Sequence, residues 1–217
     1  MLIYIVLNGS FNTRQFYEKL FNNLENKIII GVDGGNNFLH SINIKPNYVT
    51  GDFDSINPEI LDKYKKNKNI KIVFKDNQDE TDLQFSISLA KTLKPNKIVI
   101  LGAIGDRFDH IFSNILSLID IEENIETIIL DEKNEIRLVR NEIKINGNIG
   151  DIISVFPITK VDGLKYEGLK WNVNNININI GWIGISNEMI SNVAKINLEK
   201  GIIVVCRTFT NGVPKET

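Results

Sequence analysis

The sequence predicts two parts within its 217 residues: an α/β domain with a mainly parallel sheet, then an antiparallel β domain. The first observation is that short apolar runs alternate with helical patterns as far as about Asp131. Such alternation is typical of parallel strands that are joined by covering helices. The second observation is that helical periodicity disappears after Asp131, and short strand-like runs separated by turn residues take over.

In the first part, the apolar runs are short enough to be buried strands, and the segments between them have helical spacing. Among the helices, the stripe of Phe108, Ile111, Phe112, Ile115, Leu116 and Ile119 predicts one continuous apolar face. The order of elements indicates a Rossmann-like arrangement. The expected strands are Leu2–Leu7, Lys27–Val32, Tyr48–Thr50, Ile70–Phe74, Lys97–Leu101 and Glu126–Leu130, and the expected helices are Thr13–Glu25, Asn36–Ser41, Pro58–Asn67, Asp79–Leu93 and Phe108–Asp120.

The second part has the pattern of a β-sandwich or a β-barrel. Turn signals such as Asn146-Gly147 and Asp162-Gly163 separate its short apolar runs. In the Asn-rich segment Asn172–Asn179, isoleucine alternates with polar residues, which favours a strand and a turn over disorder. We place the domains at residues 1–135 and 136–217. The expected strands are Ile136–Val139, Ile152–Phe156, Leu164–Tyr166, Trp171–Val173, Val193–Leu198 and Ile202–Cys206.

Charge and composition exclude several classes of function. With 25 basic and 27 acidic residues, the net charge of −2 argues against general binding to nucleic acid or to a membrane surface. One cysteine and two histidines are too few for a disulfide or for a metal centre built from these residues. The sequence has no apolar stretch long enough to span a membrane and no basic segment before its first apolar run, so we expect a cytoplasmic protein.

Acidic or glycine-rich segments follow four consecutive strands of the predicted parallel sheet. Because binding groups gather at the carboxyl ends of parallel strands, we expect these segments to meet at one rim. They are Asp33-Gly34-Gly35, Gly51-Asp52-Phe53-Asp54-Ser55, Asp76-Asn77-Gln78-Asp79-Glu80-Thr81-Asp82 and Gly102-Ala103-Ile104-Gly105-Asp106-Arg107-Phe108-Asp109-His110.

Each segment alone could be a turn or a helix cap; Asp79 and Thr81, for example, suit an N-cap. Together, however, about half a dozen carboxylates at one rim would repel one another unless cations occupied the rim. Carboxylate oxygens without Cys or His select a hard ion, and Mg²⁺ commonly binds through one or two carboxylates and substrate phosphates. The sequence therefore predicts a metal–phosphate site.

Donors for phosphate are present in the same region. Gly102 and Gly105 would let the backbone approach a ligand, and a helix begins near Phe108 with free N–H groups. Arg107 lies at that helix end and could bind a phosphate with its guanidinium fork.

The ordered set of these four segments resembles the thiamin pyrophosphokinase family. The similarity continues into the β-rich half, where Gly168-Leu169-Lys170-Trp171 and Gly184-Ile185-Ser186-Asn187-Glu188 resemble two signatures of that family. The resemblance implies an N-terminal α/β catalytic domain and a C-terminal β-sandwich that binds thiamin and forms a homodimer with active sites between subunits. It also implies transfer of pyrophosphate from ATP to the hydroxyl of thiamin, with AMP released and Mg²⁺ as cofactor.

The resemblance also implies roles for individual residues. It implies that Asp52, Asp54 and Asp82 bind Mg²⁺. Arg107 would neutralise negative charge on the transferring group, and Asp109 would either hold Arg107 or help to align the nucleophile. Asp79 would lie close to the metal. The ATP-binding set would be Asp33, Gly34, Gly35, Gln78, Thr81, Gly102, Gly105 and Arg107, and the thiamin-binding set Trp171, Ser186 and Asn187.

Four alternatives stay open at the level of sequence. The same acidic rim would serve another Mg²⁺-dependent phosphate enzyme, or a sensor that binds thiamin or nucleotide without turnover. Thr81 would serve as a helix cap, and Trp171 would serve as a core tryptophan of the β domain.

Overall fold

The computed structural model describes residues 1–22, 26–77, 79–210 and 212. The chain divides into two compact units, Met1–Asp131 and Glu132–Thr217. Within the described residues, no helix is long and apolar enough to cross a membrane. We describe each unit by itself.

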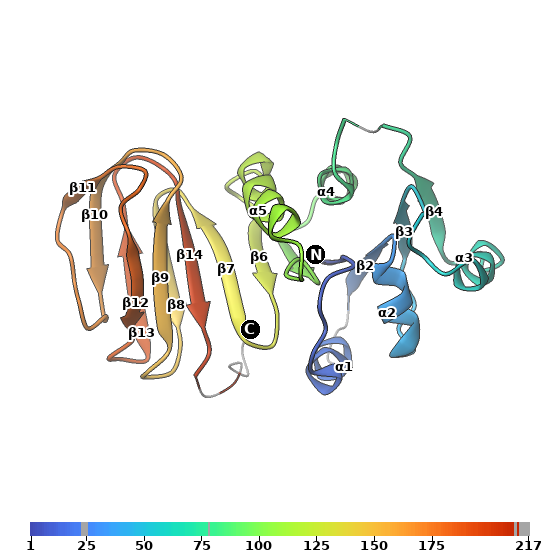
Figure 1. Cartoon of the computed structure of the whole chain (residues 1–217), viewed down its shortest axis with the longest axis horizontal. Coiled ribbons are helices and arrows are strands. Elements are labelled where there is room, and N and C mark those ends of the chain that lie inside the picture. Colours follow the sequence, from blue (N-terminus) through green and yellow to red (C-terminus); the bar gives the residue numbers. More distant parts are fainter. Residues whose placement is uncertain (23–25, 78, 211, 213–217) are drawn as a thin grey trace. The chain divides into compact units, whose positions relative to one another are not determined.

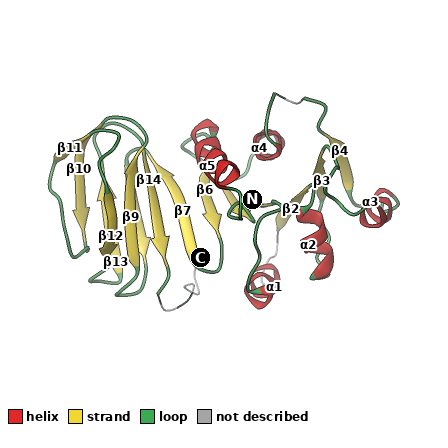
Figure 2. Ribbon diagram, viewed as in Figure 1, coloured by secondary structure: helices red, strands yellow, loops and turns green. Residues whose placement is uncertain are grey.

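The first unit is a parallel sheet in the order β6-β5-β1-β2-β3-β4, with every neighbouring pair parallel. Helices α4 and α5 lie on one face of the sheet, and α1 and α2 lie on the other (Figures 1 and 2). The prediction of a mainly parallel, helix-covered sheet is therefore confirmed. Its elements are β1 (Leu2–Val6), α1 (Arg14–Asn22), β2 (Lys27–Val32), α2 (Gly35–Ser41), β3 (Tyr48–Gly51), α3 (Pro58–Lys65), β4 (Lys71–Phe74), α4 (Asp82–Thr92), β5 (Lys97–Leu101), α5 (Phe108–Leu116), the 3-10 helix η1 (Ser117–Asp120) and β6 (Glu126–Leu130).

The strand order positions the site. The chain adds β2, β3 and β4 on one side of β1, then crosses back to place β5 and β6 on the other side. In open α/β sheets, ligands bind outside the carboxyl ends of the strands at such a reversal. The loops that follow β1 and β5 are joined by hydrogen bonds from Leu7 N–H to the Leu101 carbonyl, 2.9 Å, and from Ser10 N–H to the Ile104 carbonyl, 2.8 Å.

The expected helix Asp79–Leu93 begins later than predicted, at Asp82, because Thr81 is its N-cap. Thr81 Oγ1 accepts a hydrogen bond from Gln84 N–H at 3.2 Å, and Gln84 Oε1 accepts one from Thr81 N–H at 2.9 Å. This reciprocal pair is a capping box, so the interpretation of Thr81 as a cap is confirmed. The expected helix Phe108–Asp120 ends its α-helical part at Leu116 and continues as η1.

The predicted apolar stripe of α5 forms, but its two aromatic residues are left exposed. None of the α5 residues is buried, and Phe108 and Phe112 are 77% and 52% exposed. Their rings stack on each other with centroids 6.1 Å apart. Periodicity identifies an amphipathic face, but burial of that face depends on what packs against it.

The second unit consists of two antiparallel sheets around a shared core. One has the order β12-β9-β14-β7 and the other β11-β10-β13-β8. Inward residues of both, such as Ile153 and Val205 in the first and Leu164 and Ile196 in the second, belong to one hydrophobic cluster. This arrangement is a β-sandwich. Its strands are β7 (Asn134–Val139), β8 (Glu142–Asn146), β9 (Ile152–Pro157), β10 (Val161–Glu167), β11 (Ile176–Ile178), β12 (Gly184–Glu188), β13 (Val193–Asn197) and β14 (Ile203–Thr208).

Two differences from the expected strands concern polar segments. Trp171–Val173 is not a strand, because its backbone forms a loop, whereas the Asn-rich segment does contain strand β11. Strands β8 and β12 were not expected. Both are rich in polar residues, so their composition does not indicate strands. Their conformation depends on pairing, of β8 with β13 and of β12 with β9.

Candidate functional site

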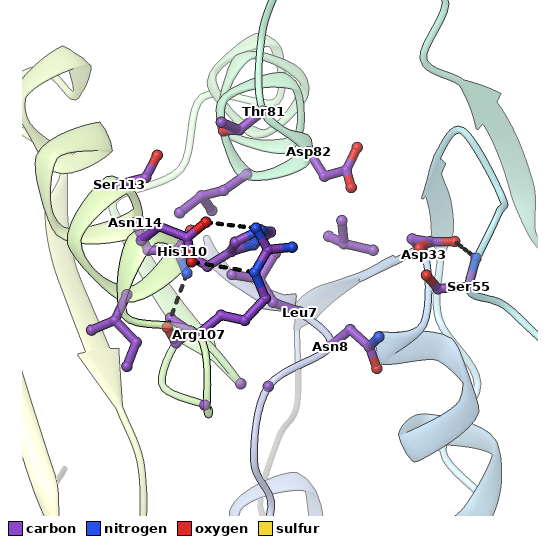
Figure 3. A pocket seen from close by; sticks show the side chains of 18 of the residues that line it. Leu7, Asn8, Asp33, Ser55, Thr81, Asp82, Arg107, His110, Ser113 and Asn114 are labelled. Carbon is purple, nitrogen blue, oxygen red and sulfur yellow. Dashed lines mark hydrogen bonds and ion pairs between the residues drawn. The ribbon is translucent and has the colours of Figure 1, made fainter. Parts of the chain in front are cut away.

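A cavity of about 780 Å³ lies in the first unit and is lined by the loops that follow β1, β2, β3, β4 and β5. The first turns of α4 and α5 complete its wall. Figure 3 shows Asp33, Asp82 and Arg107 around this space, with Asp82 at the start of α4. The predicted meeting of loops at one rim thus occurs, with Asp33, Asp52, Asp54, Thr81, Asp82, Gly102, Gly105, Arg107 and Asp109 all lining the cavity.

Three carboxylates form the densest part of the rim. Asp33, Asp52 and Asp54 each offer an oxygen atom, and these atoms lie within 4.8 Å of one another. Ser55 Oγ donates a hydrogen bond to Asp54 Oδ1 at 2.7 Å. All the potential ligands in this group are hard oxygen atoms, at a spacing that one small divalent cation could bridge.

Asp33 holds the other two aspartates in place. It is 6% exposed, and its Oδ1 accepts hydrogen bonds from Ser55 N–H and Ile56 N–H, each at 3.1 Å. Burial raises the pKa of Asp33, while these hydrogen bonds act in the opposite direction. Because its backbone N–H also donates to the Thr50 carbonyl at 2.7 Å, Asp33 fastens the Asp52–Ser55 loop to the end of β2.

Asp82, the third predicted metal ligand, lies outside this group of three. Its Oδ1 lies 3.0 Å from the ammonium of Lys75, although without the geometry of a good hydrogen bond. Lys75 also lines the cavity and donates a hydrogen bond to the Glu80 carbonyl at 3.0 Å. The three carboxylates whose oxygen atoms lie closest together are therefore Asp33, Asp52 and Asp54, and Asp82 lies beside Lys75.

Arg107 and Asp109 form a two-point ion pair at the start of α5. Arg107 Nε donates to Asp109 Oδ1 at 3.2 Å, and Nη2 donates to Oδ2 at 2.5 Å. The hydrogen bond from Arg107 lowers the pKa of Asp109, and the same contact raises that of Arg107. Both side chains are well exposed, so the guanidinium remains accessible to a ligand in the cavity.

Some predicted glycines serve the packing of the loops. A Cβ on Gly35 would lie 2.1 Å from the Val6 carbonyl oxygen, so glycine lets α2 approach β1. Gly102 has φ +65°, and a Cβ there would lie 2.5 Å from the Leu7 carbonyl oxygen. Close approach of neighbouring backbone therefore requires glycine at Gly35 and Gly102.

Three residues of the predicted ATP and catalytic sets do not line the cavity: Gly34, Gly35 and Asp79. Asp79 is exposed, and its N–H donates to Asn77 Oδ1 at 2.9 Å within its own loop. Gln78 lies outside the described residues.

Sequence reasoning missed several lining residues: Asn8, Gly9, Ser10, Lys75, Ser113 and Asn114. The Asn8–Ser10 segment follows β1, and the rule about strand ends would have found it. Asn114 lies inside α5 and connects the helix to the loop after β5, because its Nδ2 donates to the Ala103 carbonyl at 2.9 Å. Only the tertiary structure reveals that Asn114 both lines the cavity and makes this connection.

The residues predicted for thiamin lie in the second unit. Trp171 is 58% exposed, which excludes the core tryptophan, and the Lys170 ammonium lies 5.0 Å from the centroid of its ring. Asn187 is buried and holds Trp171 in place: its Oδ1 accepts from Trp171 N–H at 3.0 Å, and its Nδ2 donates to the Trp171 carbonyl at 2.7 Å. Ser186 is exposed and has φ +59°.

Comparisons with known proteins agree with both halves of the chain. The thiamin pyrophosphokinase catalytic domain model matches residues 17–130, and the thiamin pyrophosphokinase vitamin B1 binding domain model matches residues 140–203. A thiamine pyrophosphokinase of Bacillus subtilis is 31% identical over 190 residues, which cover 85% of this chain and 88% of the relative. A thiamin pyrophosphokinase of Caenorhabditis elegans is 30% identical over 171 residues, 73% of this chain and 68% of the relative.

Solved structures share the fold. The crystal structure of thiamine pyrophosphokinase from Bacillus subtilis has a TM-score of 0.85 at 29% identity and covers 97% of this chain and 100% of its own. The thiamin pyrophosphokinase from Candida albicans has a TM-score of 0.81, covering 96% of this chain and 88% of its own, and at 19% identity shows likeness of fold alone. Because the catalytic-domain model matches more than half of the sequence, the chain belongs to the thiamin pyrophosphokinase family.

Proposed function

We propose that this chain transfers the pyrophosphoryl group of ATP to the hydroxyl of thiamin, giving thiamin diphosphate and AMP. The observation that carries the proposal is the carboxylate rim of Asp33, Asp52 and Asp54 in a cavity that Arg107 and Lys75 also line. The family match over both units supplies the thiamin specificity. The domain at residues 1–135 would bind ATP, and that at 136–217 would bind thiamin.

The rim suits Mg²⁺. Its potential ligands are carboxylate oxygens within 4.8 Å of one another. Asp82 Oδ1 lies 3.0 Å from the Lys75 ammonium and has no good hydrogen bond from the described residues. We assign Asp52 and Asp54 as ligands, with Asp33 beside them. Asp82, the third ligand that the resemblance implied, pairs with Lys75 at the start of α4. When bound, the ion would neutralise charge on the phosphates.

In the reaction, the thiamin oxygen forms a bond to the β-phosphorus of ATP, and the bond from that phosphorus to the oxygen bridging to the α-phosphorus breaks. AMP leaves with the bridging oxygen, and the hydroxyl proton passes to solvent or to a carboxylate. The protein's task in such a transfer is mainly positioning and charge neutralisation. Arg107 would bind the transferring group, and Asp109 would hold the guanidinium in its fork geometry.

The remaining parts of the ATP set have smaller proposed roles. Gln78 would contact the phosphates. Thr81 would act through its cap, which fixes Asp82 at the first turn of α4. Asp79, exposed and outside the cavity wall, would act on the metal only from a distance.

For thiamin, a cation with two aromatic rings, we assign Trp171 as the stacking surface and Ser186 as a hydrogen-bonding group. Asn187 would act mainly through Trp171, because its amide already holds the backbone of that residue.

We further propose a homodimer formed through the second unit, in the cytoplasm. Edge strand β12 and its flanks carry exposed Ile180, Ile183, Ile185 and Ile190. Exposed apolar side chains beside an unpaired strand edge favour association with a second copy.

The test is to incubate the pure protein with thiamin, ATP and Mg²⁺ and to separate the products by chromatography. Thiamin diphosphate and AMP in equal amounts would support the proposal. ADP with thiamin monophosphate, or hydrolysis of ATP alone, would indicate another phosphate enzyme. Binding of thiamin or nucleotide with no product would indicate a sensor.

A further inference from the structure

Lys75 is a buried cation in the wall of the cavity. It is 5% exposed, and lysine is rarely buried to this extent without a partner. It comes directly after β4, next to Phe74, which is 56% exposed. The chain therefore turns a lysine inward and leaves the neighbouring aromatic ring outside, against the hydrophobic preference of both residues.

The inward orientation is fixed by the backbone. Lys75 N–H donates to the Gly51 carbonyl at 2.9 Å, which places the residue beside the start of the Asp52–Asp54 loop. The Phe74 ring packs at 5.7 Å from the ring of Phe53, which lies between the two aspartates. Lys75 is thus held in register with the carboxylate rim.

Among the described residues, the ammonium has two polar neighbours. It donates to the Glu80 carbonyl at 3.0 Å and lies 3.0 Å from Asp82 Oδ1. No described residue donates a good hydrogen bond to this oxygen, so Lys75 balances the charge of Asp82 there. A divalent cation that bound Asp82 would have to share this carboxylate with an ammonium, and like charges at that distance repel strongly.

We infer that Lys75 is an internal counter-cation that competes with a divalent metal ion for Asp82. In the protein without nucleotide, Asp82 is held by Lys75, and a metal ion binds only the Asp33, Asp52 and Asp54 group. Lys75 thereby lowers the affinity for metal alone. This inference rests on the proposed metal site, but it does not depend on the reaction.

The experiment measures the dissociation constant of Mn²⁺, used as a probe, by electron paramagnetic resonance of the free ion, without nucleotide or thiamin. Lys75→Met keeps the length of the side chain and removes its charge. We expect it to bind Mn²⁺ roughly tenfold more tightly than the wild type, because the repulsion between the ammonium and the metal ion is removed. The double variant Lys75→Met/Asp82→Asn should return to the wild-type affinity or below it.

Lys71→Met is the matched control, since Lys71 is an exposed lysine at the other end of β4. It should leave the affinity unchanged. Unchanged or weaker binding by folded Lys75→Met would overturn the inference, and so would a gain that persists in the double variant. If wild type and Lys71→Met bind no Mn²⁺, the proposed metal site itself fails.

A second measurement avoids any change at Lys75. With Lys75 present, Asp82→Asn should weaken Mn²⁺ binding far less than Asp54→Asn. The reason is that Asp82 is paired with Lys75 and does not bind the metal ion in the absence of nucleotide. Equal losses in the two variants would contradict the inference even if Lys75→Met did not fold.

Discussion

At the scale of single residues, some side chains of the site face the cavity, and others hold the loops that carry them. Asp52 and Asp54 line the cavity, whereas Asp33 uses one oxygen to fasten their loop. In the second unit, Asn187 has the same relation to Trp171. Replacing a residue that faces a ligand should change kinetics with little change in stability, and replacing one that holds the loop should change both.

For Asp54, we expect Asp54→Asn to lower kcat by roughly a hundredfold or more, as when an electrostatic element of the transition state is lost. Circular dichroism and the thermal midpoint should stay close to wild type. The control is Asp62→Asn, at an exposed position of α3, which should leave kcat unchanged. Near-normal turnover of a folded Asp54→Asn variant would remove this residue from the site.

For Trp171, we expect Trp171→Ala to raise the KM for thiamin while the KM for ATP changes little. The reason is that the exposed ring offers a stacking surface for a cationic aromatic ligand and fills no part of the core. Steady-state kinetics with each substrate varied in turn separates the two constants. Equal changes in both would contradict a thiamin-specific role.

A buried ion pair of the second unit gives a pH prediction. Asp151 Oδ2 accepts from Arg207 Nη2 at 2.6 Å and from Nε at 2.9 Å, and both residues are at most 3% exposed. Burial raises the pKa of Asp151, but the hydrogen bonds from Asn148 N–H, Arg207 and Thr210 outweigh it and leave the pKa below its ordinary value.

Because the pKa of Asp151 is lower in the folded state, its stabilising contribution is present above the unfolded pKa of about 3.9 and disappears as pH falls through the folded value. At pH 7, Asp151→Asn should lower the free energy of unfolding by about 3 kcal/mol, since it leaves a buried guanidinium poorly paired. The difference between variant and wild type should shrink below pH 4, as measured by thermal melting. Exposed Glu142→Gln should show no such difference.

At the scale of elements, periodicity and capping signals identified the helices, but they do not specify which helix faces become buried. The capping box at Thr81 and the Asn57-Pro58 start of α3 involve residues that are close together in the sequence. Such helix starts can therefore be recognised from the sequence. The exposure of Phe108 and Phe112 in α5 is not local, because it depends on neighbours that periodicity does not specify. Strands β8 and β12 were missed for the same reason.

The N-cap of α3 provides the prediction at this scale. Asn57 Oδ1 accepts from Glu59 N–H at 2.8 Å, so Asn57→Ala should destabilise the first unit by about 1 kcal/mol. Asn57→Asp keeps an acceptor at the helix N-terminus and should stay within about 0.5 kcal/mol of wild type. Urea unfolding followed by circular dichroism measures both. Equal losses would show that the cap is not the cause.

At the scale of the whole molecule, the proposed assembly can be tested at β12. Ile185 is 56% exposed in this edge strand, and Ile185→Asp places a charge on the proposed dimer surface. We expect the wild type to elute as a dimer in size-exclusion chromatography with light scattering, and the variant to shift towards the monomer. Ile149→Asp, at an isoleucine outside β12 that is 58% exposed, is the control. A wild-type monomer would refute the proposed homodimer.

The order of strands, helices and acidic loops already determined the class of the fold and the chemistry of the rim. Strand ends of a parallel sheet share one edge, so local patterns were enough to bring Asp33, Asp52, Asp54 and Arg107 together. Tertiary structure alone decided that Lys75 turns inward, that Asp82 pairs with it, and that Gly35 and Gly102 serve packing. These outcomes depend on distances between segments remote in sequence, which residue type and spacing do not specify.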